Sequence, residues 1–264
     1  MSSPPPEPTE PTAPSASHDA NEATATPVVV HAPAKLTLSL RVTGVRPDGL
    51  HLIDAEMVTL DFADTLTITE GAEGLSMVGA GDDVPLGPDN LVARALALAG
   101  RRAHVEIDKV IPSQAGLGGG SADAAAVLRW AGFDDVEAAA RIGADVAFCL
   151  VGGRARVRGF GEIVEPLPFV AQTLTLITPP VACSTPAVYR AWDELGGPTA
   201  EDGANDLEAA ALRVAPELAQ WRDQFAEATG QRPTLAGSGS SWFVTGAFEG
   251  PGHRIVKTTP VGWP

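Results

Sequence analysis

Alternating hydrophobic and polar residues characterise the chain from Val28 onward and indicate a protein rich in strands. In VVVHAPAKLTLSLRVTG, the leucines Leu36, Leu38 and Leu40 occupy every second position. This spacing is typical of strands in a half-buried sheet. The segment AEMVTLDFADTLTITEG predicts more strand, with a break near Ala63, and RPDGLH between the two carries turn residues.

Helical spacing appears between and after these strands. PDNLVARALALAGRRA predicts a helix capped by Asp89 or Asn90, and HVEIDKVIP predicts a strand ending at Pro112. A second helix is expected from about Ser121. DVEAAARIGADVAFCLVGG then predicts a helix, a short loop and an apolar segment, and GRARVRGFGEIVEPL predicts strands with glycine hinges.

A second unit is expected from Pro166. TLTLITPP predicts a strand, TPAVYRAWDEL and NDLEAAALRVAPELAQWRDQFAEAT predict helices, and TLAGSGSSWFVTGAF predicts a strand, a glycine turn and a strand or helix. HRIVKTTPVGWP predicts a closing strand that could return to the first unit. Strands and helices mix without strict alternation, which favours an α+β fold in two lobes, residues 28–165 and 166–264.

Composition separates residues 1–27 from the rest. They are rich in Pro, Ser, Thr and Ala, contain four acids and no Lys or Arg, and offer almost nothing to bury. We expect a disordered tail, with a solubilising extension or a docking segment for a partner as the alternatives. The tail lacks the basic start and apolar run of a signal peptide.

Charge and cysteine content narrow the function classes. The 264 residues carry a net charge of −15, which disfavours nucleic acid as the main partner. The two cysteines, Cys149 and Cys183, lack metal-ligand spacing and fit a reducing cytoplasm, although one disulfide would also be compatible. No apolar run reaches the roughly 18 residues that span a bilayer. We therefore expect a cytoplasmic protein, a monomer or weak homodimer, without a membrane partner.

The segment IPSQAGLGGGSADAAAVL carries the clearest chemistry. Four glycines fall within the five residues from Gly116 to Gly120, directly before an alanine-rich helix. Free N–H groups and the dipole at a helix start attract anions, and glycines let a phosphate chain approach the backbone. The Walker pattern fails because no lysine follows Gly120, and the dinucleotide pattern is met only loosely. A flexible strand-to-helix turn is the alternative.

Two charged residues stand out in apolar surroundings. Lys35 sits in an apolar strand and is the candidate cation for phosphoryl transfer, the alternative being an edge lysine that reaches solvent. Asp145 precedes an apolar segment, where a carboxylate is either a helix cap or a functional acid.

The chain resembles the GHMP kinase superfamily in several motifs that occur in the family's order. PSQAGLGGGSADAAAVL is similar to its ATP-binding loop, and APAKLTLSLRVTGVRPDGLH, IGADVAFCLVGG and LAGSGSSWFV resemble its other motifs. The resemblance covers nearly everything from Val28 and implies a two-lobed fold, with a lobe like ribosomal protein S5 followed by a ferredoxin-like lobe. It also implies ATP as the phosphate donor, Mg²⁺, and a small-molecule acceptor with a CDP moiety.

The resemblance also implies roles for individual residues. Asp145 would be the base or orienting acceptor for the substrate hydroxyl, and Lys35 would offset its charge and the developing charge. For ATP the matching positions are Asn90, Lys109, Gly116, Leu117, Gly118, Gly119, Gly120 and Ser121. Ser121 would also cap the helix that follows the glycine loop. For Lys109 the alternative is a solvated charge on a strand. For the acceptor the matching positions are His51, Thr185, Tyr189, Gly237, Ser238 and Gly239.

The acceptor residues have plain alternatives and some family positions differ. His51, expected to read the cytosine, could be a surface turn histidine, and Tyr189, expected to stack on the base, could be a core tyrosine. Thr37 stands where the family usually has asparagine. Leu50 stands where it usually has tyrosine, and this departure removes one aromatic wall from the expected base pocket. The rival functions are another small-alcohol kinase and a nucleotide-binding regulator without turnover.

Overall fold

The computed structural model describes residue 1 and residues 26–79, 85–200 and 203–263. The predicted tail, residues 1–27, lies almost entirely outside the described residues.

Strands and helices follow the order that the hydrophobic pattern predicts. The strands are β1 (Val28–Val45), β2 (His51–Glu70), β3 (Gly74–Gly79), β4 (Ala103–Lys109), β5 (Arg154–Gly159), β6 (Ile163–Pro166), β7 (Thr173–Ile177), β8 (Thr234–Leu235), β9 (Trp242–Thr245) and β10 (His253–Thr259). The helices are α1 (Leu91–Leu98), α2 (Gly119–Trp130), α3 (Val136–Ile142), α4 (Ala144–Val151), α5 (Thr185–Glu194), α6 (Glu208–Val214) and α7 (Leu218–Thr229).

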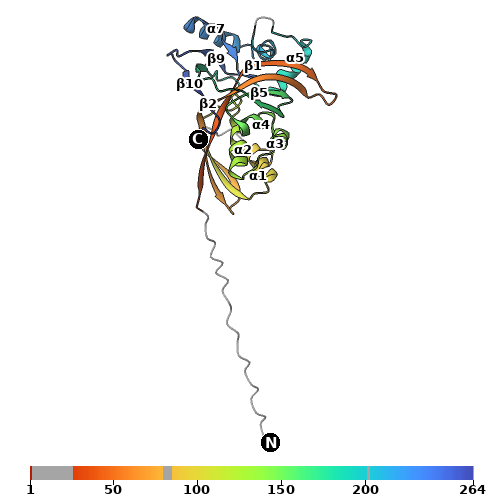
Figure 1. The fold of residues 1–264 in the computed structure, drawn as a ribbon, viewed down its shortest axis with the longest axis vertical. Helices are drawn as coiled ribbons and strands as arrows, with labels where there is room; N and C mark the ends of the chain where they lie inside the picture. The colour runs from red at the N-terminus through yellow and green to blue at the C-terminus, as the bar shows by residue number, and fades with distance from the viewer. Residues whose placement is uncertain (2–25, 80–84, 201–202, 264) are drawn as a thin grey trace.

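The long antiparallel pair β1–β2 runs through the molecule and links its two ends (Figure 1). The predicted break near Ala63 is wrong as an interruption, because β2 continues through it as a strand. A bulge occurs there instead. The register moves from Pro33 opposite Ala63 to Lys35 opposite Thr59. Such a bulge bends the pair and re-aims its side chains.

Helices α1 to α4 gather beside one part of this pair, with α2 in contact with β1, β2, α1 and α4 (Figure 1). The alanine-rich sequence of α2 explains its central position. Ala122, Ala124, Ala125 and Ala126 are fully buried, and their small side chains let neighbouring backbones approach closely. The residues that alternate on β1 and β2 complete this core, with Leu36, Leu60 and Leu66 fully buried.

The closing strand β10 joins both parts of the sheet, as the sequence allowed. It pairs with β7 from His253 to Lys257, and its last residues, Thr258 and Thr259, pair with β2. The sheet order is β3-β4-β2-β10-β7-β9-β8, and β1, β5 and β6 attach alongside. Helices and a mostly antiparallel sheet confirm the α+β prediction, whereas the lobe boundary at 165/166 stays a prediction.

Two local outcomes differ from the expected elements. The predicted helical stretch after residue 205 divides into α6 and α7, because Pro216 has no N–H for a continuous helix. The short loop expected between α3 and α4 is reduced to Gly143.

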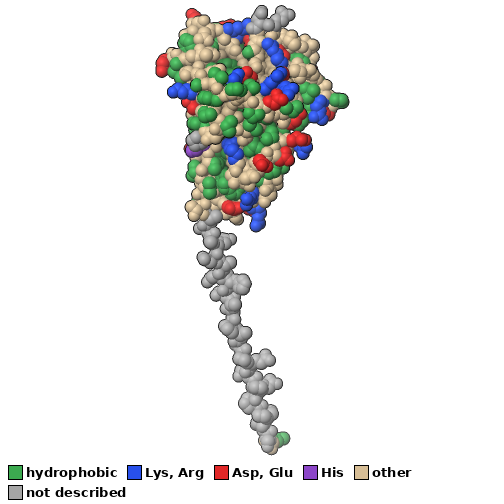
Figure 2. Space-filling model, viewed as in Figure 1, with side chains coloured by type: hydrophobic (Ala, Val, Ile, Leu, Met, Phe, Trp, Pro, Cys, Tyr) green, Lys and Arg blue, Asp and Glu red, His purple; other side chains and the backbone are tan. Residues whose placement is uncertain are grey.

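Charges on the face shown in Figure 2 are interspersed: Lys and Arg side chains lie next to Asp and Glu side chains. Ion pairs of this kind occur along β5, where Arg154 pairs with Glu56, Arg156 with Asp54, and Arg158 with an acid on β6.

Candidate functional site

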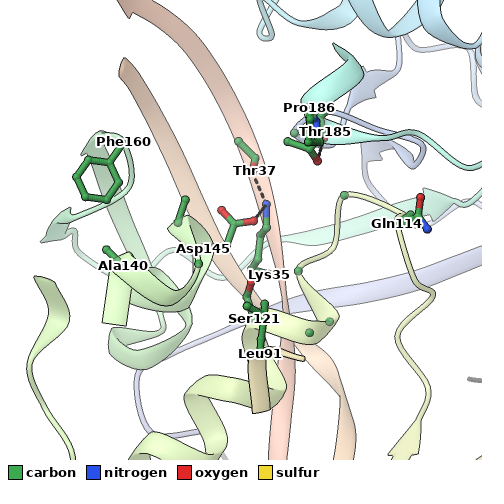
Figure 3. A pocket seen from close by; sticks show the side chains of 18 of the residues that line it. Lys35, Thr37, Leu91, Gln114, Ser121, Ala140, Asp145, Phe160, Thr185 and Pro186 are labelled. Carbon is green, nitrogen blue, oxygen red and sulfur yellow. Dashed lines mark hydrogen bonds and ion pairs between the residues drawn. The ribbon is translucent and has the colours of Figure 1, made fainter. Parts of the chain in front are cut away.

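A single large cleft gathers most of the residues that the sequence predicts for the site. It has a volume of about 1490 Å³ and lies between the glycine loop, β1, the start of α4 and the start of α5 (Figure 3). The predicted residues that line it are Lys35, His51, Asn90, Lys109, Gly116, Gly118, Gly119, Gly120, Ser121, Asp145, Thr185, Tyr189, Gly237 and Ser238. Two do not: the side chain of Leu117 is buried, and Gly239 lines a smaller adjoining cavity of about 300 Å³.

The glycine loop makes close backbone approaches to the protein itself. A Cβ on Gly116, whose φ is +77°, would lie 2.2 Å from the carbonyl oxygen of Ala236. A Cβ on Gly118, whose φ is +69°, would lie 2.7 Å from Cγ of Lys35. The loop is also tied to β1, because the N–H of Lys35 donates to the carbonyl of Leu117 at 3.0 Å. Part of the glycine run is therefore required by internal packing.

The start of the phosphate helix differs from the prediction. Helix α2 begins at Gly119, and Gly118 is its N-cap without a side-chain hydrogen bond, so the expectation that Ser121 caps it is wrong. Glycine starts the helix because the cap residue has a left-handed backbone, which serine adopts poorly. The N–H groups of the first turn have no intrahelical partners and are available to an anion at this end.

Lys35 and Asp145 form an ion pair in the cleft, with Nζ and Oδ2 2.9 Å apart (Figure 3). Lys35 is 4% exposed, which rules out the alternative that it is an edge lysine reaching solvent. Its ammonium also donates to Oγ1 of Thr37 at 3.1 Å. Asp145 lies in the first turn of α4, where the helix dipole favours a carboxylate, and its N-cap is Gly143. Asp145 is therefore not a cap and remains available as a functional acid.

Lys109 belongs to a buried cluster beside the glycine loop. Its ammonium pairs with Asp64 and, at 2.8 Å, with Asp123, so the alternative of a solvated strand charge is wrong. Two carboxylates face one ammonium. Burial lowers the pKa of Lys109, but the two acids outweigh it and the net direction is upward. Burial raises the pKa of Asp123 to about 7. The charge of Asp64 raises this pKa further, whereas the ammonium of Lys109 lowers it.

The residues predicted to hold the acceptor's base lie around His51. Its Nε2 is 2.9 Å from Oδ1 of Asp193, and its ring centroid is 4.6 Å from that of Tyr189. The ring of Trp192 is nearly perpendicular to that of His51, with centroids 5.7 Å apart. His51 thus contacts three side chains of α5. Burial raises the pKa of Tyr189 above its usual range, and the charge of Asp145 adds to this, so the phenol stays neutral.

The third glycine motif borders the cleft beside the phosphate loop, since a Cβ on Gly116 would lie 2.2 Å from the carbonyl oxygen of Ala236. Oγ of Ser238 is 2.7 Å from Oγ1 of Thr185, at the first residue of α5. Gly237 has a φ of +58°, and a Cβ there would lie 3.6 Å from Nζ of Lys35. The motif therefore borders both the ion pair and the acceptor side.

Asn90 is confirmed as the cap of α1. Its Oδ1 accepts from the N–H of Val92 at 2.8 Å, and its amide donates to the carbonyl of Pro85 at 2.9 Å. Because these bonds occupy its side chain, a nucleotide contact through Asn90 stays a prediction.

Sequence reasoning missed several residues that line the cleft. Asp123 follows the glycine loop directly, and Asp193 lies in α5 four residues after Tyr189. Phe160 adds an aromatic side chain to the lining of the cleft. Its signal in the sequence is weak, a single aromatic within the glycine hinge GFGE.

The described ranges, residue 1 and residues 26–79, 85–200 and 203–263, contain neither a ready-made metal cluster nor a membrane-spanning helix. No group of three or more His, Cys, Asp or Glu within them could hold a metal ion on its own. None of the helices described is both long and apolar enough to cross a membrane. Cytoplasmic location and a monomer or weak homodimer stay predictions.

Comparison with known proteins gives consistent results. Residues 90–153 match the family model for the GHMP kinases N terminal domain. A 4-diphosphocytidyl-2-C-methyl-D-erythritol kinase from Paracoccus denitrificans (strain Pd 1222) is 38% identical over 259 residues, covering 88% of this chain and 93% of the relative. A protein of the same name from Cereibacter sphaeroides (strain KD131 / KCTC 12085) is 40% identical over 265 residues, covering 88% and 95%.

Solved structures agree with these relatives. A crystal structure of 4-(cytidine 5'-diphospho)-2C-methyl-D-erythritol kinase superposes with a TM-score of 0.68 at 31% identity, covering 88% of this chain and 99% of that one. A homoserine kinase from Cytophaga hutchinsonii has a TM-score of 0.58 at 18% identity, covering 89% and 95%, which indicates a shared fold alone.

Proposed function

The chain belongs to the family of 4-diphosphocytidyl-2-C-methyl-D-erythritol kinases, and from this premise we propose how its residues divide the work of phosphoryl transfer. The enzyme transfers the γ-phosphate of ATP to the 2-hydroxyl of 4-diphosphocytidyl-2-C-methyl-D-erythritol, in the non-mevalonate route to isoprenoid precursors. The observation that carries the assignment of roles is the Lys35–Asp145 ion pair, 2.9 Å long, in the cleft that the glycine loop borders.

Asp145 is the proposed acceptor of the hydroxyl proton. The acceptor oxygen attacks the γ-phosphorus, the bond from that phosphorus to the β,γ-bridging oxygen breaks, and ADP departs with the electron pair of that bond. The proton of the hydroxyl passes to the carboxylate of Asp145. Lys35 keeps this carboxylate oriented through the ion pair, and its ammonium offsets charge that develops on the transferring group.

The loop from Gly116 to Ser121 is the proposed cradle for the triphosphate. The N–H groups in the first turn of α2 have no intrahelical partners, and the helix dipole favours an anion at this end of the helix. A Cβ on Gly120 would make only an ordinary van der Waals contact, with Cδ1 of Leu91 at 3.7 Å. Because Gly118, Gly119 and Gly120 all line the cleft, a phosphate chain could approach their backbone from it.

The donor set of the cleft fits a Mg²⁺ ion that arrives with ATP. Mg²⁺ commonly takes one or two carboxylates, substrate phosphates and waters, so a closed cluster of protein ligands is not required. We propose that the hydroxyl of Ser121, which lines the cleft at the start of α2, would help to hold it together with the phosphates. The ion would supply charge neutralisation at the phosphates.

His51 and Tyr189 are the proposed contacts for the cytosine, with Thr185 and Ser238 toward the diphosphate and alcohol. A test of the whole assignment measures ADP release with the complete acceptor and with the same alcohol lacking the CDP moiety. We expect turnover only with the first. Equal turnover with both would show that the base pocket has no role in selecting the acceptor.

Replacing Tyr189 by alanine is expected to weaken binding of the acceptor while ATP affinity stays within about threefold. Base–aromatic stacking contributes about 1–3 kcal/mol, which corresponds to a loss of roughly 5- to 150-fold in affinity. The truncation also removes the ring that packs on His51. Titration calorimetry with each ligand measures both affinities.

Tyr189→Phe is the matched control for this prediction. It keeps the ring and removes only the hydroxyl, so acceptor affinity should stay near that of the wild type. Equal losses for ATP and acceptor in a destabilised Tyr189→Ala protein would instead identify Tyr189 as a core residue.

A further inference from the structure

We propose that Asn205 is a positioning residue for phosphoryl transfer: it fixes the third glycine motif, Leu235–Gly239, against the catalytic lysine. This inference rests on the proposed roles of Lys35 and Asp145. Asn205 lies in the loop before α6, does not line the cleft, and belongs to none of the motifs that the sequence analysis connected with catalysis.

The side chain of Asn205 is fully used in holding that motif. Its Nδ2 donates to the carbonyl of Leu235 at 2.9 Å and to the carbonyl of Gly237 at 2.6 Å. Its Oδ1 accepts from the N–H of Leu207 at 2.9 Å. The two carbonyls require a donor and the N–H requires an acceptor, so these partners determine which side-chain atom is Nδ2 and which is Oδ1. Asn205 is 2% exposed, so water would not replace these hydrogen bonds if they were lost.

The motif that Asn205 holds touches both halves of the reaction centre. A Cβ on Gly237 would lie 3.6 Å from Nζ of Lys35 and 3.7 Å from Oγ1 of Thr37. On its other side the motif packs against the phosphate loop, since a Cβ built on Gly116 would lie only 2.2 Å from the carbonyl oxygen of Ala236. A shift of the motif by a fraction of an ångström would therefore change the packing around the ammonium of Lys35.

Asn205 is itself anchored to the strand that carries the lysine. The N–H of Leu40 donates to the carbonyl of Ala204 at 2.8 Å, and the N–H of Asp206 donates to the carbonyl of Leu40 at 3.0 Å. Because Lys35 lies on the same strand, Asn205 sets the distance between the glycine motif and the lysine.

Asn205→Asp is the sharpest test because it keeps the shape and removes both N–H donors. The new carboxylate can still accept from Leu207, but two carbonyl oxygens would face it, and they would move away. Misplacement by about 1 Å can cost roughly 100-fold in rate. We expect kcat to fall roughly 10- to 100-fold, with the KM for ATP within about threefold of the wild type.

Asp206→Asn is the matched control. The neighbouring side chain is equally buried, at 2% exposure, and contacts β1 and the backbone of Ala200, not the glycine motif. The backbone hydrogen bonds that join Ala204 and Asp206 to Leu40 remain in this variant. Losing the charge opposite Arg41 should therefore lower the melting temperature and leave kcat within about threefold. Asn205→Ala removes the donors without adding a charge, and should lower kcat in the same way if Asn205→Asp fails to fold.

Steady-state kinetics, ATP titration and melting curves on these three variants test whether Asn205 positions the glycine motif. A folded Asn205→Asp or Asn205→Ala enzyme with kcat within threefold of the wild type would overturn the proposal. So would an Asp206→Asn enzyme that loses as much kcat as the Asn205 variants, because general loosening would then explain both. Absence of ADP release from the wild-type enzyme with the CDP acceptor would instead contradict the proposed function.

Discussion

Asp145→Asn is expected to lower kcat by roughly 10²- to 10⁴-fold, the range for a lost general acid or base, with both substrates still bound. Asparagine is nearly isosteric but cannot take a proton from the hydroxyl at neutral pH. The change also leaves the ammonium of Lys35, 4% exposed, without its carboxylate partner at 2.9 Å. Some loss of melting temperature should therefore accompany the kinetic effect.

Lys35→Met should reduce kcat by about 10²- to 10³-fold, the scale of a lost electrostatic stabiliser. If the ion pair acts as one unit, the double variant should be little worse than the poorer single variant, since effects within such a unit are not additive. Fully multiplicative losses would keep both residues in the mechanism and show that they act independently.

Asp135→Asn is the control for these charge changes. Asp135 caps α3 by accepting from the N–H of Ala138 at 2.9 Å, and asparagine caps about equally well. This variant removes one negative charge at a neighbouring helix start without touching the cleft, so its kcat should stay near that of the wild type. A folded Asp145→Asn enzyme with near-normal kcat would remove Asp145 from the mechanism.

Gly119→Val is expected to abolish measurable ATP binding, the largest effect in the nucleotide site. A Cβ at this position would already lie 3.1 Å from Cγ2 of Ile111 and 3.1 Å from Nζ of Lys109. The two γ-methyl groups of valine would add to this crowding, push the loop outward and disturb the buried Lys109–Asp123 pair. The backbone that should receive phosphate would then be displaced.

Gly87→Val separates this effect from a general cost of replacing glycine by valine. Gly87 is exposed, and nothing lies within 4 Å of a Cβ built on it. Its ATP affinity, measured by titration calorimetry beside a melting curve, should match the wild type. A folded Gly119→Val protein with wild-type ATP affinity would mean that the phosphate cradle lies elsewhere.

The sequence predicted the elements and most members of the site, because both depend on local patterns. Alternation at Leu36, Leu38 and Leu40 indicated a strand, and the glycine run before an alanine-rich segment indicated a loop and a helix. Motif resemblance marked Lys35 and Asp145, which the fold brings into one ion pair. Boundaries were less certain, as the cap at Gly118 in place of Ser121 shows, because a left-handed cap leaves little trace beyond the glycine itself.

Tertiary structure alone decided what these residues face. The sequence explained the glycines by an approaching phosphate, whereas Gly116 and Gly118 are also required by the carbonyl of Ala236 and the stem of Lys35. Asn205 has no local signal for this role, because the carbonyls that its amide holds lie about 30 residues ahead and its anchor lies on β1. Local periodicity reports which face of an element is buried. Contacts between distant segments depend on how the chain folds back, and no short stretch of sequence contains that information.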